Sequence, residues 1–225
     1  MIAEEIKNIT SELPAGVKLI AVSKFHPAEA IMEAYDAGQR LFGENKVQEM
    51  TAKHEVLPAD IQWHFIGHLQ TNKVKYIAPF VAMIHSIDSL HLLQEVDRQA
   101  EKAGRIIDVL LQIHIAHEET KFGMTFDECR ELLNEGTWRQ LTHVRICGLM
   151  GMATFTDDMI QVEHEFASLQ AFLEELKIKW FAGETAFKEL SMGMTEDYPI
   201  AIRHGSTFIR IGTLIFGERK YNKLT

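Results

Sequence analysis

The sequence predicts an α/β protein that folds as a single (β/α)8 barrel, or TIM barrel. Three observations lead to this prediction. Eight short β-rich segments recur along the chain, helical patterns separate them, and no linker or low-complexity tract divides the 225 residues. A doubly wound open sheet is the main alternative, because periodicity does not distinguish a closed parallel sheet from an open one. The count of eight strands favours the barrel, with residues 1–225 in one domain.

The predicted strands read as near-continuous apolar runs, as in the segment IIDVLLQIHI at residues 106–115. Such runs are typical of parallel strands that are covered on both faces, whereas half-exposed strands alternate apolar and polar residues. In chain order the predicted strands are residues 18–23, 39–43, 61–67, 80–86, 106–115, 143–150, 187–192 and 207–212.

Helical stretches lie between these strands, and cap residues mark where several of them begin and end. Ser89 is a capping serine, and Gly104 ends the helix that it starts. Thr125 and Glu128 have the spacing of a capping box, and Gly136 ends that helix. The predicted helices are residues 28–37, 89–103, 125–134, 157–176 and 195–203.

The composition excludes several classes of protein. The 32 acidic and 23 basic residues give a net charge of −9, without the basic surface of a nucleic-acid binder or a polybasic segment for membranes. The N-terminus lacks the pattern of a signal peptide, and no segment approaches the roughly 20 apolar residues of a membrane span. Cys129 and Cys147 form no CxxC motif, which fits a reducing compartment. We expect a cytoplasmic monomer that binds neither nucleic acid nor membrane.

Lys24 is the first candidate for chemistry. In a barrel of this type the active site lies at the carboxyl ends of the strands, and Lys24 follows the apolar residues 19–22 at such an end. Desolvation there would lower the pKa of the amine and make it nucleophilic towards an aldehyde. The alternative is a surface lysine whose stem lies along the barrel mouth.

The C-terminal stretch 204–217 (HGSTFIRIGTLIFG) carries a second signal. Phosphate sites in this fold favour the loops after strands seven and eight, where Gly212 would let backbone amides approach an anion. Ser191, at the carboxyl end of the seventh predicted strand, could add a hydroxyl, although Gly212 could equally be only a turn residue. Arg210 lies inside an apolar strand and needs an acceptor, because an unpaired buried charge is very costly.

The 11 histidines raise the question of a metal site. His64 and His68 are four residues apart, but they straddle a strand end, where helical spacing does not bring side chains together. No HExxH motif or carboxylate cluster accompanies them, so we expect no metal.

Seven ordered motifs resemble a known family. The chain is similar to the pyridoxal phosphate homeostasis proteins, whose fold is similar to the N-terminal barrel of alanine racemase. The motifs cover nearly the whole chain: AVSKFHP (21–27), FGENKVQE (42–49), WHFIGHLQTNK (63–73), HSIDS (85–89), GLMGMAT (148–154), ELSMGMTEDYPIAI (189–202) and GSTFIRIGTLIFGER (205–219).

The resemblance implies a cofactor and the residues that bind it. The cofactor would be pyridoxal 5′-phosphate, and Lys24 resembles the lysine that forms a Schiff base with it. Arg210 resembles the residue that faces the pyridine nitrogen. The remaining expected contacts are Ser191, Gly212 and Thr213 to the phosphate and Asn45 in the pocket wall.

These expectations favour a protein that holds pyridoxal phosphate on Lys24 and buffers it or delivers it, with apo-enzymes as recipients, rather than an efficient enzyme. An arginine donates to the pyridine nitrogen but does not protonate it, which weakens the electron sink that racemisation needs. In alanine racemase a second acid/base comes from a further domain, which we expect this chain to lack. The alternatives are a slow racemase, in which Tyr198 would be the second acid/base, and a cofactor-free Schiff-base aldolase.

Overall fold

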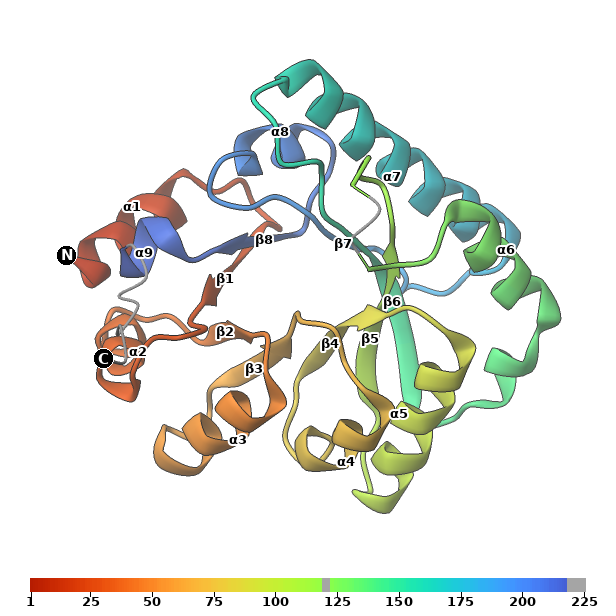
Figure 1. Cartoon of the computed structure of the whole chain (residues 1–225), viewed down its shortest axis with the longest axis horizontal. Helices are drawn as coiled ribbons and strands as arrows, with labels where there is room; N and C mark the ends of the chain where they lie inside the picture. The colour runs from red at the N-terminus through yellow and green to blue at the C-terminus, as the bar shows by residue number, and fades with distance from the viewer. Residues whose placement is uncertain (119–121, 218–225) are drawn as a thin grey trace.

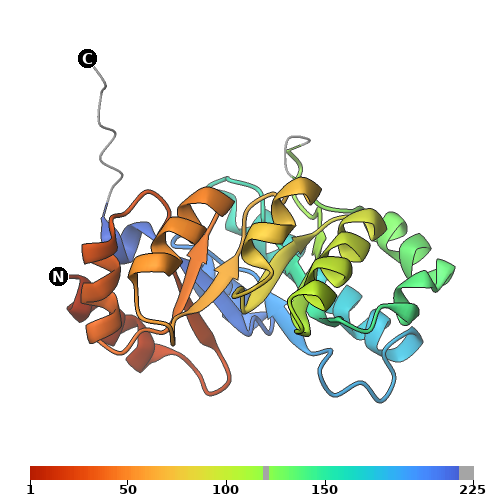
Figure 2. The same cartoon turned by 90° about the horizontal axis from the view of Figure 1, so that it is seen from below.

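The computed structural model describes residues 1–118 and 122–217, and in these residues eight parallel strands form a closed barrel. Each strand pairs with the next, and β8 pairs with β1. Figure 1 shows this ring of strands with the helices outside it, and Figure 2 shows the barrel from its side. The strands are β1 (Lys18–Val22), β2 (Leu41–Glu44), β3 (Gln62–Phe65), β4 (Met83–Ile87), β5 (Ile107–Ile113), β6 (Val144–Gly151), β7 (Glu189–Ser191) and β8 (Phe208–Ile211). The predicted fold is confirmed.

The five predicted helices correspond to α2, α5, α6, α7 and α8. The Ser89 hydroxyl accepts from the Leu92 amide at 3.3 Å, and Thr125 and Glu128 form the expected capping box. The α-helices are α1 (Ile2–Glu12), α2 (Ala28–Asp36), α3 (Val47–Val56), α4 (Val74–Ile77), α5 (Leu90–Lys102), α6 (Phe126–Glu135), α7 (Met159–Lys179), α8 (Tyr198–Arg203) and α9 (Thr213–Phe216). Two 3-10 turns are η1 (Thr71–Lys73) and η2 (Thr137–Gln140).

Helices α1, α3, α4 and α9 are not among the predicted segments. α4 and α9 have only four residues each, too few to show a periodic pattern. α3 places Lys53 on its buried side, which breaks the apolar stripe by which an amphipathic helix is recognised. In α3, α4 and α9, therefore, no periodic apolar pattern marks the helix in the sequence.

Two groups of buried residues make up the core. The larger lies between the strands and the helices, and the smaller includes Ile20, Leu110 and Phe208, which alternate along their strands with residues of the larger group. The smaller group therefore fills the barrel interior. Polar side chains are buried there as well: His64, His85, Ser191 and Arg210 are each at most 4% exposed.

In the part of the chain that the structure describes, no helix combines the length and the apolar character needed to cross a membrane.

Candidate functional site

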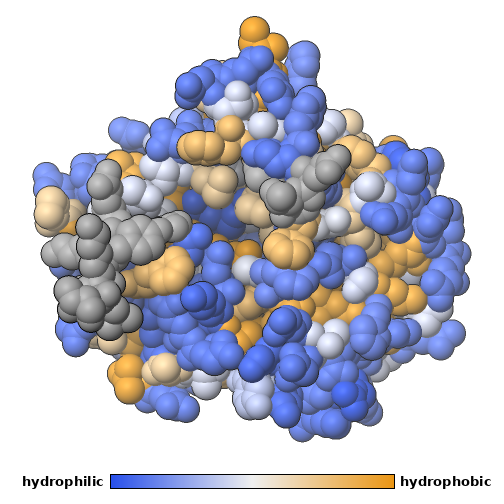
Figure 3. Space-filling model, viewed as in Figure 1, coloured by the Kyte–Doolittle hydropathy of each residue, from blue (hydrophilic) through white to orange (hydrophobic). Residues whose placement is uncertain are grey.

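A cavity of about 620 Å³ opens where the strands end, and it brings together five of the six predicted site residues. Lys24 follows β1, Asn45 follows β2, and Arg210, Gly212 and Thr213 lie on or after β8. Figure 3, which shows the molecule from the side of Figure 1, has hydrophilic and hydrophobic residues mixed around a hollow near the centre of this face. The parallel strands deliver these residues to one place because all their carboxyl ends meet at the same mouth of the barrel.

Lys24 lies in a tight turn between β1 and α2. Its side chain is partly buried and lines the cavity. The next residue, Phe25, has a φ of 66°, a left-handed conformation that is uncommon for any residue other than glycine. The Phe25 amide donates to Glu49 Oε1 at 2.6 Å. A strained backbone conformation persists only where neighbouring groups stabilise it. Here Glu49, on α3, is such a group.

An ion cluster, formed by the buried residues Ser23, Glu44 and Lys53 and the partly exposed Glu49, supports this turn. Lys53 Nζ donates to Glu44 Oε1 at 2.7 Å, to Glu49 Oε1 at 2.7 Å and to the Ser23 carbonyl at 2.8 Å. The Ser23 hydroxyl donates to Glu44 Oε1 at 2.6 Å. Burial raises the pKa of Glu44, while Lys53 and the Ser23 hydroxyl act in the opposite direction. The cluster ties β1, β2 and α3 together directly before the lysine.

Sequence reasoning missed most of this cluster. Glu44 is recognisable as a residue at a strand end, but nothing in the sequence connects it to Lys53. The spacing of Glu49 and Lys53, four residues apart on one helix face, is the only available signal.

Asn45 forms part of the cavity wall and has an unsatisfied oxygen. Its Oδ1 is buried and has no hydrogen-bond partner among the described residues. Gly67 packs directly behind it, since a Cβ at Gly67 would overlap the Asn45 carbonyl oxygen. Buried polar atoms are nearly always paired, so an orphaned acceptor on a cavity wall fits a bound polar molecule.

Arg210 has the acceptors that its burial requires. It is 4% exposed, and its Nη1 donates to Ser191 Oγ at 2.6 Å and its Nη2 to the Gly151 carbonyl at 3.0 Å. Burial lowers the pKa of Arg210 to about 10, while Asp197 opposes the change. The guanidinium therefore stays charged at neutral pH and faces the cavity as a fixed donor.

Ser191 is the predicted site residue that does not line the cavity. It is fully buried behind Arg210, and its hydroxyl contacts Arg210 Nη1 and His85 Nδ1. Its contact with a phosphate stays a prediction.

Gly212 and Thr213 place the start of α9 at the cavity. A Cβ at Gly212 would lie 3.1 Å from the Val22 carbonyl oxygen, so glycine lets β8 and β1 approach closely here. The first amides of a helix have no acceptor within it. The backbone at Gly212 and Thr213 can therefore donate to an anion in the cavity.

Tyr198 is not one of the described residues that line the cavity. It is the first residue of α8 and packs, partly buried, against the core. The ionisable side chains that do line the cavity are Lys24, Asp157, Glu196, Asp197 and Arg210. No group of three or more His, Cys, Asp or Glu residues that could hold a metal occurs in residues 1–118 and 122–217.

The comparisons with known proteins identify the family. The model of the alanine racemase N-terminal domain matches residues 1–220. A pyridoxal phosphate homeostasis protein from Aquifex aeolicus is 41% identical over 205 residues, 91% of this chain and 88% of the relative. One from Schizosaccharomyces pombe is 38% identical over 211 residues, 92% of this chain and 86% of the relative. The chain belongs to the pyridoxal phosphate homeostasis protein family.

Solved structures agree with this assignment. PipY from Synechococcus elongatus, solved with pyridoxal phosphate bound, is 41% identical and has a TM-score of 0.87 over 96% of this chain and all of PipY. Alanine racemase from Bartonella henselae is 14% identical, with a TM-score of 0.73. The match spans 99% of this chain and 60% of the racemase. That likeness concerns the fold alone.

Proposed function

We propose that this protein binds pyridoxal 5′-phosphate in the cavity, holds it as a Schiff base on Lys24, and buffers the cofactor or delivers it. The observation that carries the proposal is the meeting of a lysine, a buried arginine and an unsatisfied asparagine in one cavity. The relatives named for pyridoxal phosphate homeostasis, and the PipY structure with that cofactor bound, support it.

Each residue has a role that follows from its chemistry. When bound, pyridoxal phosphate would supply an aldehyde, a group with which a primary amine condenses reversibly with loss of water. Lys24 supplies the amine, and its turn is held by the ion cluster. Gly212 and Thr213 offer backbone donors to the phosphate, and Asn45 Oδ1 offers an acceptor to a polar substituent.

Arg210 is the reason to propose a carrier rather than an efficient enzyme. A guanidinium that remains charged donates a hydrogen bond to the pyridine nitrogen but does not transfer a proton to it. The ring is then a weak electron sink. Lys24 could act on one face of a bound amino acid, and Tyr198, the residue suspected for the other face, lies outside the cavity lining. The slow racemase and the cofactor-free aldolase are less well supported than the carrier.

The first test is the visible absorption of the protein after pyridoxal phosphate is added, compared between wild type, Lys24→Ala and Lys46→Ala. Lys46 is exposed and lies beside the same turn, with its Nζ 5.2 Å from the centroid of the Phe25 ring. It serves as the matched control. We expect a Schiff-base band in wild type and Lys46→Ala and none in Lys24→Ala. Borohydride reduction followed by peptide mass spectrometry should place the cofactor on Lys24. A band that survives in Lys24→Ala would contradict the proposal.

The second test separates a carrier from an enzyme. The loaded protein is mixed with an apo-enzyme that depends on pyridoxal phosphate, and recovery of that enzyme's activity is compared with recovery from free cofactor. Racemisation of alanine is measured in parallel. Ordinary turnover in the racemase assay would overturn the carrier role. The monomeric state and cytoplasmic location stay predictions, and size-exclusion chromatography with light scattering tests the first.

A further inference from the structure

Four buried side chains form a continuous hydrogen-bonded chain through the barrel interior. Arg210 Nη1 lies 2.6 Å from Ser191 Oγ, Ser191 Oγ lies 2.9 Å from His85 Nδ1, and His85 Nε2 lies 2.9 Å from His64 Nδ1. The four residues come from β8, β7, β4 and β3. One end lies at the cavity that we assign to the cofactor. The other end lies at a separate cavity of about 510 Å³, which His64 lines together with Lys18.

The chemistry of arginine determines which group donates and which accepts in each of these hydrogen bonds. A guanidinium can only donate, so Ser191 Oγ accepts from Arg210. The Ser191 hydroxyl hydrogen is then free to donate to His85 Nδ1. His85 must carry its own hydrogen on Nε2 and donate it to His64 Nδ1. His64 in turn carries its hydrogen on Nε2, which is buried and has no partner among the described residues.

The opposite direction leaves more groups unsatisfied. If both histidines carried their hydrogens on Nδ1, Ser191 would accept twice and its own hydrogen would be buried without an acceptor. His64 Nε2 would then be an unpaired acceptor. The first arrangement leaves one unpaired group, His64 Nε2–H, and the second leaves two, so the first is favoured.

Both histidines are neutral in this environment. His85 is fully buried and His64 is 3% exposed. The centroid of the Phe208 ring lies 5.7 Å from that of His85 and 5.5 Å from that of His64. The cations that lower their pKa values are Lys18, near His64, and Arg210, near His85. The carboxylates of Asp108 and Glu189 line the same cavity as His64. Burial, reinforced by these cations, lowers the pKa of both, that of His64 to about 3.

We propose that His85 and Ser191 are positioning residues for Arg210, which orient an acceptor towards its Nη1 and so hold the guanidinium against the cofactor. Ser191 without His85 could turn its hydroxyl hydrogen towards Arg210 and repel it. His85 prevents this by taking that hydrogen. The inference rests on the proposed function only for the claim that Arg210 meets the pyridine ring, because the hydrogen-bond chain itself exists without a cofactor.

The first experiment tests the chain without pyridoxal phosphate. Long-range ¹H–¹⁵N correlation spectra of the apo-protein, assigned with His64→Gln and His85→Gln, report which nitrogen of each ring carries the hydrogen. We expect Nε2–H tautomers for both histidines, with no titration between about pH 5.5 and pH 8 around the ordinary histidine pKa. An Nδ1–H tautomer at His85, or titration near its ordinary pKa, would overturn the proposal.

The second experiment tests the effect on the cofactor. Ser191→Ala and His85→Leu remove the acceptor or its orienting partner, whereas His85→Gln retains an acceptor and a donor. The control is Ser86→Ala, because Ser86 is fully buried beside His85 on β4 and its hydroxyl has no partner among the described residues. Each variant is titrated with pyridoxal phosphate, and the Arg210 side-chain NMR signals are recorded.

We expect Ser191→Ala and His85→Leu to bind the cofactor about tenfold more weakly, the value of one charge-assisted hydrogen bond. They should also shift the absorption maximum and the Arg210 signals, while His85→Gln and Ser86→Ala resemble wild type. Unchanged Arg210 signals and spectra in Ser191→Ala would overturn the positioning role. If Lys24→Ala still forms the Schiff-base absorption band while both histidines have the expected tautomers, the proposed function is wrong but the inferred hydrogen-bond chain from Arg210 to His64 is retained.

Discussion

Lys53 Nζ lies 2.7 Å from Glu44 Oε1, directly beneath the turn that carries Lys24. The carboxylate is fully buried and the ammonium nearly so, with side-chain exposures of 0% and 9%. Two residues that are not among the described residues lining the cavity thus hold the backbone from which Lys24 projects. The same cluster, through Glu49, holds the left-handed residue Phe25 that follows the lysine.

Lys53→Met is expected to lower the free energy of unfolding by about 3–5 kcal/mol, because it leaves the Glu44 carboxylate buried without its cation. Urea denaturation measures this change. Lys53→Met combined with Glu44→Gln should recover part of the loss, since the double variant buries no unpaired charge. Both variants should take up pyridoxal phosphate less completely than wild type. If Lys53→Met has the same urea midpoint as the control variant Lys46→Met, the ion cluster does not stabilise the fold.

Arg210→Gln is expected to weaken pyridoxal phosphate binding about ten- to hundredfold. A hydrogen bond from a charged donor contributes about 1.5–3 kcal/mol, and each 1.4 kcal/mol is about tenfold in affinity. Fluorescence or absorption titration measures the dissociation constant. Arg203→Gln is the control, because Arg203 lies on the exposed side of α8 near Glu163. Equal affinities for the two variants would mean that Arg210 does not contact the cofactor.

Gly67→Ala is expected to weaken cofactor uptake without unfolding the protein. A Cβ at Gly67 would overlap the Asn45 carbonyl oxygen and lie 2.7 Å from the Asn45 Cα, so the cavity wall must move. Overpacking of this kind costs about 1–3 kcal/mol. In Gly43→Ala the added Cβ meets instead the side chains of Ile20 and Ile66, which can shift. Thermal unfolding should show a loss of stability in both variants, and titration a loss of affinity mainly in Gly67→Ala.

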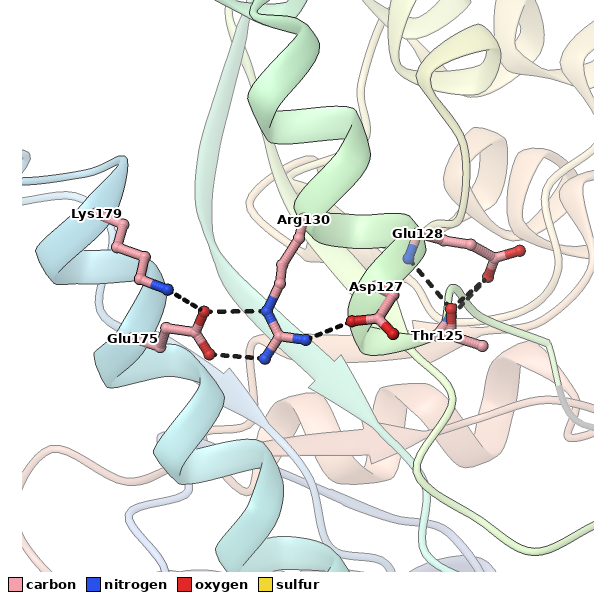
Figure 4. Close-up of polar contacts among 6 residues, drawn as sticks. All are labelled: Thr125, Asp127, Glu128, Arg130, Glu175 and Lys179. Atoms are coloured by element: carbon pink, nitrogen blue, oxygen red, sulfur yellow. Dashed lines mark hydrogen bonds and ion pairs between the residues drawn. The ribbon is translucent and has the colours of Figure 1, made fainter.

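Glu175 links α6 and α7 and makes stability depend on pH. Figure 4 shows its carboxylate between the Arg130 guanidinium, at 2.8 and 3.0 Å, and Lys179 Nζ, at 2.9 Å. These hydrogen bonds, that of Arg130 first, lower the pKa of Glu175 to about 2. A lowered carboxyl pKa gives stability that is present above the unfolded value, about 4.3, and is lost as the pH falls towards the folded value.

Glu175→Gln should therefore be less stable than wild type at neutral pH, by about 1 kcal/mol, as is usual for partly exposed pairs. The difference should shrink below about pH 4. Urea unfolding at several pH values measures it. The control is Glu174→Gln, whose carboxylate is 58% exposed and pairs with Lys177 on the same helix. A difference that does not change with pH would show that the pair does not cause it.

The sequence predicted much of the candidate site because in this fold site residues lie at the carboxyl ends of the strands. Lys24, Asn45 and Gly212 follow strands, and in a closed parallel barrel all strand ends meet at one mouth. The need of a buried Arg210 for an acceptor was also predictable, since burial of an unpaired charge is so costly. The identity of that acceptor was not, because Ser191 and Arg210 meet through strand pairing that periodicity does not specify.

His64 and His68 show why spacing must be interpreted together with secondary structure. They are four residues apart, but β3 ends between them, and, as the sequence predicted, their side chains have different partners. His68 stacks on Phe122 and lies 3.5 Å from Asp88, whereas His64 bonds to His85 on the neighbouring strand. Helical spacing predicts proximity only on a helix.

The apolar runs, the caps and the residues at strand ends were enough to predict the barrel and the mouth where its candidate site lies, because each depends on local pattern and on one topological rule. Only the closed structure brings His85 of β4 to Ser191 of β7, 106 residues further along the chain. These strands are not neighbours in the sheet. Their side chains meet because closure points both into one interior, and no pattern along the chain records that meeting.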